Sequence, residues 1–533
     1  MAVAVYLGAR GITDESSVML GGDMSRYAMN GVYMYDLILS GGVWSVDDLV
    51  AHAERYFARY PALSLGHHPP LPSIALLPFY AIFGVSMLAA RLSALAFFAL
   101  AVWQLYALGK RLLGWQVASW ATLLFITNVY VLRFGQYVLS EMPMLALVLT
   151  SLNALCGYCE TGQKKHYAWF VIAAAASLYA KQLAIFMFPM YALILVARFG
   201  WRHLQERYLI GWTLVGALLV APLVAITLRL SPSNVAIATK NIRNLGNDRG
   251  VTMWEIVTTI VTTHLSLPLA LVVIAGALGL AVRRERLGLL GLVWLLLSIG
   301  GSILFAARIE PARYAFSAMP AYVLIAASLA AIPSSRRVAA AVVIVLGAAV
   351  LWQAWLIRNL YPSGAGGYEA AASYVIDHSA SPTVLLDTSI DTGYFVFFVR
   401  KHDETRRLVV LRADKLLDTE DEKDPSAPPK DRAEFYAHLR EFGIQFIVLE
   451  ESRSGPPTLL QMRSELKSDR FEERRRIPIA SRDRAVSGLD LVIYEFKDAQ
   501  PPNLDAQLDV AVRSRKWSLR LRDLLEPNAG LRR

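Results

Sequence analysis

Residues 92–112 read LSALAFFALAVWQLYALGKRL, an apolar run that carries no charge until Lys110 and Arg111 near its end. A helix of about 20 such residues matches the hydrocarbon thickness of a bilayer. A second run, WQVASWATLLFITNVYVLR, follows at once over 115–133, and comparable runs continue to residue 357. The sequence therefore predicts a polytopic α-helical membrane protein with about 10–11 spanning helices. The predicted spans are 92–112, 115–133, 139–158, 167–181, 182–198, 208–230, 264–282, 287–306, 314–332 and 337–357.

The composition also favours a membrane protein. Of the 533 residues, 55% are hydrophobic and 18% are charged, whereas a soluble domain carries about 25% charged residues. The formal net charge is +10. This excess lies in short connectors between apolar runs and not on one folded face, so we expect membrane lipids and no nucleic acid as partners.

Five basic connectors each follow every second predicted span. Under the positive-inside rule such connectors lie in the cytoplasm, and the alternate connectors lie on the outer face. This predicts a multi-pass protein of the plasma (cell inner) membrane, with everything after residue 358 on the extracytoplasmic side. The basic connectors are Lys110–Arg111, Lys164–Lys165, Arg198 to Arg207, Arg283 to Arg286, and Arg336–Arg337.

Residues 1–90 are predicted to form an outer-face first loop with interfacial helices. The stretch from Pro69 to Gly84 is apolar but short, and its four prolines break helical hydrogen bonding. We read it as an interfacial or re-entrant element. Met1 to Ala9 is too short to span. Either a first transmembrane helix is truncated or missing, which we favour, or the N-terminus crosses unaided.

The chain changes character after residue 358, the end of the transmembrane helical domain predicted over 91–358. Pro362 to Gly367 reads as a linker. Short apolar runs then alternate with helical patterns, which predicts a small extracytoplasmic α/β domain over 365–498. No glycine fingerprint follows its first strand, so no nucleotide site is expected. The polar tail 499–533 favours an amphipathic helix around Trp517–Leu519 or disorder equally.

Asp23 is the first candidate for a functional residue. Arg26 and Tyr27 follow three and four residues later, so all three share one face of a helix that starts near Asp23. The structural alternative for Asp23 is a capping carboxylate at the start of that helix.

His67 and His68 precede a proline pair and could contact a phosphate or an acceptor hydroxyl. Neighbouring residues of an extended chain point to opposite sides, so the two rarely bind one metal together. The alternative is a pair of solvated loop histidines. A divalent cation is possible but not favoured, and we predict no metal site and no cofactor.

Further polar residues occupy predicted outer ends of helices. Glu141 is the only acid between residues 71 and 159, and its structural alternative is a partner for Arg133. Lys181, Arg308, Arg313 and Tyr314 could hold an anionic lipid head group, although interfacial anchoring also accounts for them. An acid in the first loop and bases from separate helices would together serve a hydroxyl nucleophile and a phosphate leaving group.

Five motifs in order over residues 20–335 make the chain resemble the GT-C membrane glycosyltransferases, of the protein O-mannosyltransferase and aminoarabinose-transferase type (glycosyltransferase family 39-like). The first is the acidic first loop D-x-x-R-Y-A, and the second is a basic residue before P-P-L. F-G followed by R-L-x-S-A, an acid before M-P, and R-Y ahead of a helix proline complete the set. They stand here at Asp23–Ala28, His68–Leu71, Phe83–Gly84 with Arg91–Ala94, Glu141–Met144, and Arg313–Tyr314 with Pro320.

The resemblance implies roles for these residues. Asp23 would be the catalytic base, supported by Arg26, Tyr27, His67 and Glu141. His68, Lys181, Arg313 and Tyr314 would bind the phosphate of a polyprenyl-phosphate sugar donor. The family often has a second acid directly after the first-loop Asp, whereas this chain has Met24, which weakens any metal-binding carboxylate pair there.

The leading hypothesis is a glycosyltransferase that moves a hexose or pentose from a polyprenyl-phosphate donor to a hydroxyl of a lipid, glycan or protein. Transfer would occur at the outer face with inversion. A transporter or flippase of lipid-linked glycans is the alternative, but ionisable residues lie at helix ends and hardly any lie mid-helix. A receptor or scaffold that uses the outer α/β domain is the third.

Overall fold

The structure is a computed structural model that divides into two compact units. The membrane unit comprises Met1–Thr13, Leu65–Pro72 and Arg91–Pro362, and the sheet unit comprises Asp14–Ser64, Ser73–Ala90 and Ser363–Arg533. The residues described are 1–13, 18–19, 23–41, 45–65, 67–230, 253–283, 286–306, 312–331, 335–358, 364–387, 389–391, 393–417, 431–452, 455–481, 486–512 and 515–525.

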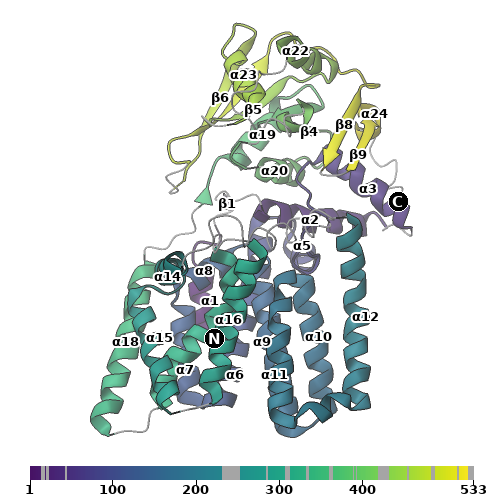
Figure 1. Cartoon of the computed structure of the whole chain (residues 1–533). Helices are drawn as coiled ribbons and strands as arrows, with labels where there is room; N and C mark the ends of the chain where they lie inside the picture. The colour runs from purple at the N-terminus through teal and green to yellow at the C-terminus, as the bar shows by residue number, and fades with distance from the viewer. Residues whose placement is uncertain are drawn as a thin grey trace. The chain divides into compact units, whose positions relative to one another are not determined.

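The membrane unit is helical, and every predicted span contains a helix (Figure 1). Six helices are long and apolar enough to cross a membrane, and two sharply bent helix pairs raise this to as many as eight among the described residues. The chain is therefore a multi-pass membrane protein. The helices are α1 (Ala2–Ala9), α6 (Met87–Leu113), α7 (Trp115–Ile126), α8 (Val129–Gln136), α9 (Glu141–Thr161), α10 (Lys164–Ala180), η1 (Gln182–Met187), α11 (Phe188–Phe199), η2 (Trp201–Gln205), α12 (Arg207–Leu230), α14 (Met253–Thr259), η3 (Ile260–Leu265), α15 (Leu267–Val282), α16 (Arg286–Ala306), η4 (Ala312–Ala318), α17 (Met319–Ala327), η5 (Ser328–Ala331) and α18 (Arg336–Arg358).

Two of the predicted spans differ from single straight helices. The span 115–133 is broken into α7 and α8, which meet at 68°. Asn128 causes the break, because its side chain accepts the backbone N–H of Val131 and thereby starts a new helix. The span predicted from 264 starts at α15, after a 112° bend at which Ser266 has a φ of +68°.

Basic connectors come together at one end of the membrane unit. Arg111, at the end of α6, lies 3.6 Å from Glu160 of α9, and Arg198 of α11 donates to the Cys159 carbonyl at 3.1 Å. Arg283 donates to the carbonyl of Ala331 at 3.2 Å and lines a small pocket together with Leu113 of α6. The alternation deduced from charge is thus present in the fold, and we call this end of the membrane unit the basic end.

The C-terminal part of the sheet unit is the predicted α/β fold. Its five-stranded sheet has the order β4-β3-β5-β7-β6, in which β3 is parallel to β4 and β5 whereas β7 is antiparallel to β5 and β6. The strands are β3 (Thr383–Leu386), β4 (Val409–Arg412), β5 (Phe446–Glu450), β6 (Phe471–Pro478) and β7 (Asp490–Phe496), and the helices around them are α19 (Tyr368–His378), α20 (Tyr394–His402), α21 (Ala413–Leu416), α22 (Arg432–Glu441) and α23 (Pro457–Glu465).

The first loop folds onto this sheet instead of standing alone. Met19 of β1 (Val18–Met19) pairs with Gly364 of β2 (Gly364–Ala365). Two longer helices follow, α2 (Asp23–Leu39) and α3 (Val46–Arg59), and then two short apolar helices, α4 (Leu71–Ile74) and α5 (Leu77–Phe83). The apolar stretch 71–83 is too short to cross a bilayer. Instead α5 packs on α2 at Gly31, where an added Cβ would lie 3.1 Å from Leu76 Cβ.

A buried network of charges ties α2 to the C-terminal part of the sheet unit. The carboxylate of Asp36 on α2, 1% exposed, accepts hydrogen bonds from Arg400 on α20 (2.8 Å, Nε), Arg406 (3.0 Å) and Tyr56 on α3 (2.7 Å). We call these four residues the Asp36 network. Two guanidinium groups and a phenol compensate the cost of burying the carboxylate.

The described part of the tail, residues 499–512 and 515–525, contains a β-hairpin, so the equal choice between an amphipathic helix and disorder around Trp517–Leu519 was wrong. These residues lie in β9 (Arg515–Arg520), which pairs antiparallel with β8 (Gln507–Val512). Trp517 packs edge-on against Phe57 of α3, with ring centroids 6.0 Å apart. The hairpin therefore covers α3, and α24 (Leu521–Leu525) follows it; residues 526–533 lie outside the described part.

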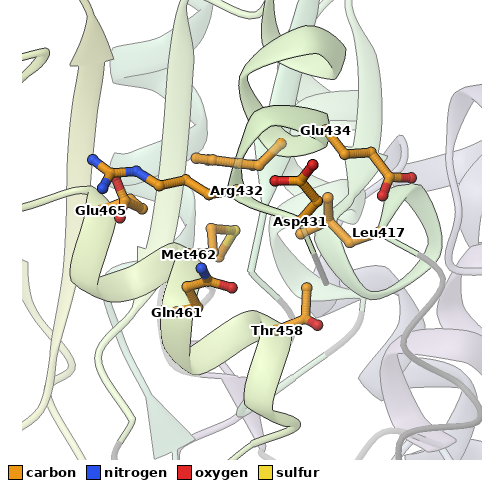
Figure 2. A pocket seen from close by; sticks show the side chains of 9 residues that line it. Leu417, Asp431, Arg432, Glu434, Thr458, Gln461, Met462 and Glu465 are labelled. Carbon is orange, nitrogen blue, oxygen red and sulfur yellow. The ribbon is translucent and has the colours of Figure 1, made fainter. Parts of the chain in front are cut away.

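A small pocket lies between α22 and α23 (Figure 2). Glu465 binds Arg432 at 2.6 Å and accepts the hydroxyl of Tyr436, and Asp431 caps α22 through the N–H of Ala433. Helix packing and capping account for these charges, so we assign no ligand to the pocket. Its lining residues are Leu417, Asp431, Arg432, Glu434, Phe435, Thr458, Gln461, Met462 and Glu465.

Candidate functional site

Asp23 is the first residue of α2, as the sequence predicted. The carboxylate lies in the first helical turn, where the unpaired backbone N–H groups and the helix dipole favour negative charge. Asp23 is half-buried, whereas the next two residues, Met24 and Ser25, are fully buried. The helix turn therefore fixes the carboxylate while leaving it within reach of solvent or substrate.

Arg26 lies one turn further along α2 among several charges. Burial and the neighbouring guanidinium of Arg412 lower its pKa, and the carboxylates of Asp23, Asp391 and Asp414 oppose that shift. An arginine guanidinium keeps its positive charge in proteins. Arg26 is thus electrostatically shared between Asp23 and two carboxylates of the C-terminal segment.

Tyr27 is 3% exposed and forms part of the core under α2. Its carbonyl accepts the hydroxyl of Ser73, at the start of the apolar stretch before α5, at 3.3 Å. Tyr27 supports the placement of the helix, and its ring is not presented to solvent.

Four predicted residues of the membrane unit meet at the end opposite the basic end. Glu141, the first residue of α9, is 1% exposed and binds Lys181 Nζ at 2.6 Å. Arg313 Nε lies 3.9 Å from the same carboxylate oxygen. Tyr314 completes the group, since the Lys181 ammonium lies 4.9 Å and the Arg313 guanidinium 5.5 Å from its ring centroid.

We call these four residues the Glu141 cluster, and its formation depends on three helix junctions. Glu141 starts α9, Lys181 follows the end of α10, and Arg313 and Tyr314 lie on η4. The expected alternative partner of Glu141, Arg133, is exposed instead. The cluster carries two cations and one anion, so it retains net positive charge for an anionic head group.

His67 and His68 also lie in the membrane unit and are half-buried. Their rings contact each other, with centroids 4.8 Å apart and planes inclined by 57°. His68 forms a backbone bridge with Leu65, which fixes the turn before the proline pair.

The predicted residues therefore fall into two groups. Asp23, Arg26 and Tyr27 belong to the sheet unit, and the histidine pair and the Glu141 cluster belong to the membrane unit. Arg308 lies outside the described residues. Within the described ranges no three His, Cys, Asp or Glu side chains gather as metal ligands, and metal independence stays a prediction.

Sequence reasoning missed the residues of the C-terminal segment that surround Arg26. Asp391, Arg412 and Asp414 come from the loop after β3, the end of β4 and the start of α21. Their position in the sequence could have indicated them. All three lie at or just after the carboxyl ends of the parallel strands β3 and β4, and such ends share one edge of the sheet.

These two groups supply complementary chemistry. A fixed, half-buried carboxylate can accept a proton from a hydroxyl, and a cationic cluster can bind a phosphate and stabilise charge that develops on it.

A known protein family matches part of the chain. Residues 67–226 match the family described as dolichyl-phosphate-mannose-protein mannosyltransferase. No curated protein sequence matches the chain.

Solved structures show the fold over nearly the whole chain. ArnT from Cupriavidus metallidurans, in its apo state and bound to undecaprenyl phosphate, is 14% identical with a TM-score of 0.60, over 94% of this chain and 98% of ArnT. Arabinofuranosyltransferase AftD from Mycobacteria is 16% identical with a TM-score of 0.52, over 95% of this chain and 40% of AftD. The oligosaccharyltransferase AglB from Archaeoglobus fulgidus, in complex with an inhibitory peptide and a dolichol-phosphate, is 11% identical with a TM-score of 0.53, over 84% and 68%.

These likenesses confirm the resemblance seen in the sequence. The chain has the GT-C fold: a helical membrane part and a C-terminal α/β part.

Proposed function

We propose that this multi-pass membrane protein, with its GT-C fold and its mannosyltransferase-family match over 67–226, is a glycosyltransferase that uses a polyprenyl-phosphate-linked sugar. The acceptor is a hydroxyl of a lipid, glycan or protein. The observation that carries the proposal is the Glu141 cluster, in which Lys181 and Arg313 flank one buried carboxylate where helices end.

The proposed reaction is a single displacement. Asp23 takes the proton of the acceptor hydroxyl as the acceptor oxygen forms a bond to the anomeric carbon. The bond between that carbon and the phosphate oxygen breaks, and its electron pair stays with the polyprenyl phosphate. Attack opposite the leaving group inverts the anomeric configuration.

The cationic residues act on the leaving group. Lys181 and Arg313 bind the donor phosphate and stabilise the negative charge that grows on it as the bond breaks. Tyr314 orients both cations through its ring, and His68, aided by His67, adds a donor to the phosphate. Arg26 supports Asp23 in its ionised form.

We infer that transfer occurs on the extracytoplasmic side of the plasma membrane. The Glu141 cluster lies at the end of the membrane unit opposite the basic end, about 30 Å away for a helix the length of α9. If the basic end is cytoplasmic, as positive charge between spans favours, the cluster faces outward.

The proposal is tested by sugar transfer from radiolabelled polyprenyl-phosphate donors, in membranes that hold wild-type protein or the variant Asp23→Asn. We expect label to reach an acceptor only with the wild type, because the amide cannot accept the proton. Donor binding should persist in Asp23→Asn, since the phosphate contacts are unchanged.

Asp47→Asn is the matched control, because Asp47 is an exposed acid of the same first loop, and it should transfer like the wild type. Full activity in Asp23→Asn would refute the role of Asp23. Absence of transfer from every donor by well-folded wild-type protein would refute the enzyme and favour transport of lipid-linked glycans.

A further inference from the structure

The carboxyl edge of the parallel strands β3 and β4 is the place where an α/β sheet normally receives a ligand. Here the loop after β3, which contains Asp391 and Gly393, contacts the first turn of α2, with Ser25 and Arg26. Both segments belong to the sheet unit. The turn that carries Asp23 therefore occupies the edge that the sheet would offer to a ligand.

The closest contact of this kind is between Gly393 and Ser25. A Cβ added to Gly393 would lie 2.5 Å from the Ser25 hydroxyl oxygen and 2.6 Å from Ser25 Cβ, and next 3.3 Å from Ala62 Cβ. Gly393 has a φ of −138°, which any residue can adopt, so its backbone does not require glycine. Glycine is required at this position because Ser25 lies too close to leave room for a side chain.

Asp391 forms the second contact. Its carboxylate, in a residue 2% exposed, accepts the N–H groups of Gly393 (2.8 Å) and Tyr394 (3.0 Å) and so orders the start of α20. Burial raises the pKa of Asp391, and the N–H groups of Gly393 and Tyr394, the nearby Ser25 hydroxyl and the Arg26 guanidinium oppose part of that rise. The carboxylate thus acts both on its own loop and on the first turn of α2.

Arg412 and Asp414 complete the set of charged groups that interact with Arg26. The Arg412 guanidinium binds Asp414 through two hydrogen bonds, at 2.9 and 2.6 Å, and donates to the carbonyl of Pro61 at 3.2 Å. The groups that face Arg26 are then Asp23 on α2, Asp391 on the loop, Arg412 on β4 and Asp414 on α21.

We propose that Asp391 and Gly393 are positioning residues for the catalytic turn, so that the C-terminal α/β segment forms part of the active site through Ser25 and Arg26. This rests on the proposed function, in which Asp23 is the base. It gives the C-terminal segment a role in catalysis that is separate from any binding of acceptor.

The steric half of the proposal is tested with Gly393→Ala, Ser25→Gly and the double variant. Gly393→Ala should displace Ser25 and lower kcat about 10- to 100-fold, since small misplacements of reacting groups cost that much, with little change in the donor KM. Ser25→Gly removes both clashing atoms, so the double variant should recover most of the activity of Ser25→Gly alone.

The electrostatic half is tested with Asp391→Asn, which keeps the shape and the acceptor oxygen for the loop. Without the Asp391 charge, Arg26 attracts Asp23 more strongly and stabilises its ionised form, so the acid limb of the pH–rate profile should move to lower pH while kcat falls. Asp377→Asn, an exposed acid on α19 of the same unit, is the control and should match the wild type in both.

The outcomes are distinguishable from failure of the proposed function. If wild-type transfer depends on Asp23 but Asp391→Asn has wild-type kcat and pH profile, the positioning role is refuted. It is equally refuted if Gly393→Ala is folded and active, or if the double variant is folded and no more active than Gly393→Ala. Should Gly393→Ala not fold, as judged by thermal unfolding of the purified protein, the isosteric Asp391→Asn decides the question.

Discussion

At the scale of single residues, Glu141 sets the charge available to a phosphate. Its buried carboxylate binds Lys181 at 2.6 Å and lies near Arg313, so it competes with any anion for the same two cations. Near a protein surface a charge pair at 4 Å is worth about 4 kcal/mol before desolvation, which leaves a net effect large enough to measure.

We therefore expect Glu141→Gln and Lys181→Gln to change the affinity for undecaprenyl phosphate in opposite directions. Glu141→Gln should tighten binding several-fold, because the cluster gains net positive charge, and Lys181→Gln should weaken it. Titration of the purified variants with undecaprenyl phosphate measures both. Equal effects in the same direction would mean that the cluster serves only to hold the helices.

At the scale of elements, α15 and α17 pack at a distance that depends on Gly276. A Cβ at this position would overlap the carbonyl oxygen of Ile325 on α17 and lie 2.8 Å from its carbonyl carbon. A backbone carbonyl cannot move aside as a flexible side chain can, so the two helices would have to separate.

Gly276→Ala should therefore destabilise the membrane unit by about 1–3 kcal/mol or more, as overpacked cores do. Gly347→Ala on α18 is the matched control, because no atom lies within 4 Å of its added Cβ, and it should be neutral or slightly stabilising. Thermal unfolding of both purified variants compares them, and equal melting temperatures would contradict the close packing of α15 and α17.

The sequence predicted the helices well wherever long apolar runs or the positive charge of the connectors dominated the pattern. Each of the ten predicted apolar runs contains a helix among the described residues, although only six of these helices, or up to eight with the bent pairs, are long and apolar enough to span. The basic connectors predicted which helix ends meet. The break at Asn128 was not predicted. A single side chain that can cap a helix inside an apolar run competes only locally with continuation of the helix, and the apolar pattern does not show which of the two prevails. The hairpin β8–β9 was not predicted. Its strands are stabilised by packing on α3, a long-range contact that hydrophobic periodicity along the chain does not report.

The candidate site was predicted only in part for a related reason. Residues 141, 181 and 313 could be assigned to one membrane face from topology, and the Glu141 cluster joins them. Asp391 and Arg412 could not be assigned to the neighbourhood of Asp23, because more than 360 residues separate the segments and no periodic pattern encodes that long-range contact.

At the scale of the whole molecule, the sheet unit joins three separate stretches of chain, and the Asp36 network is the buried link between the first and the last. We expect Asp36→Asn to destabilise this unit by about 3–5 kcal/mol, because Arg400 and Arg406 lose their carboxylate while they stay partly buried.

Glu369→Gln is the control for that prediction. Glu369 binds Lys401 at 2.8 Å but is 23% exposed, so its removal should cost at most about 1 kcal/mol. Chemical denaturation or limited proteolysis of the purified full chain measures both. Similar losses in the two variants would mean that the Asp36 network is not a buried link.

The Asp36 network also has a consequence for synthesis. Asp36 and Arg400 are 364 residues apart, and ribosomes add about 5–20 residues per second, so Asp36 exists for on the order of 20–70 s before its partner is made. During that interval all the membrane helices are translated while α2 lacks the charges that bury its carboxylate. The turn that carries Asp23 can therefore reach its folded surroundings only after the segment with Arg400 and Arg406 has been made, so the sheet unit is completed later than the described helices of the membrane unit.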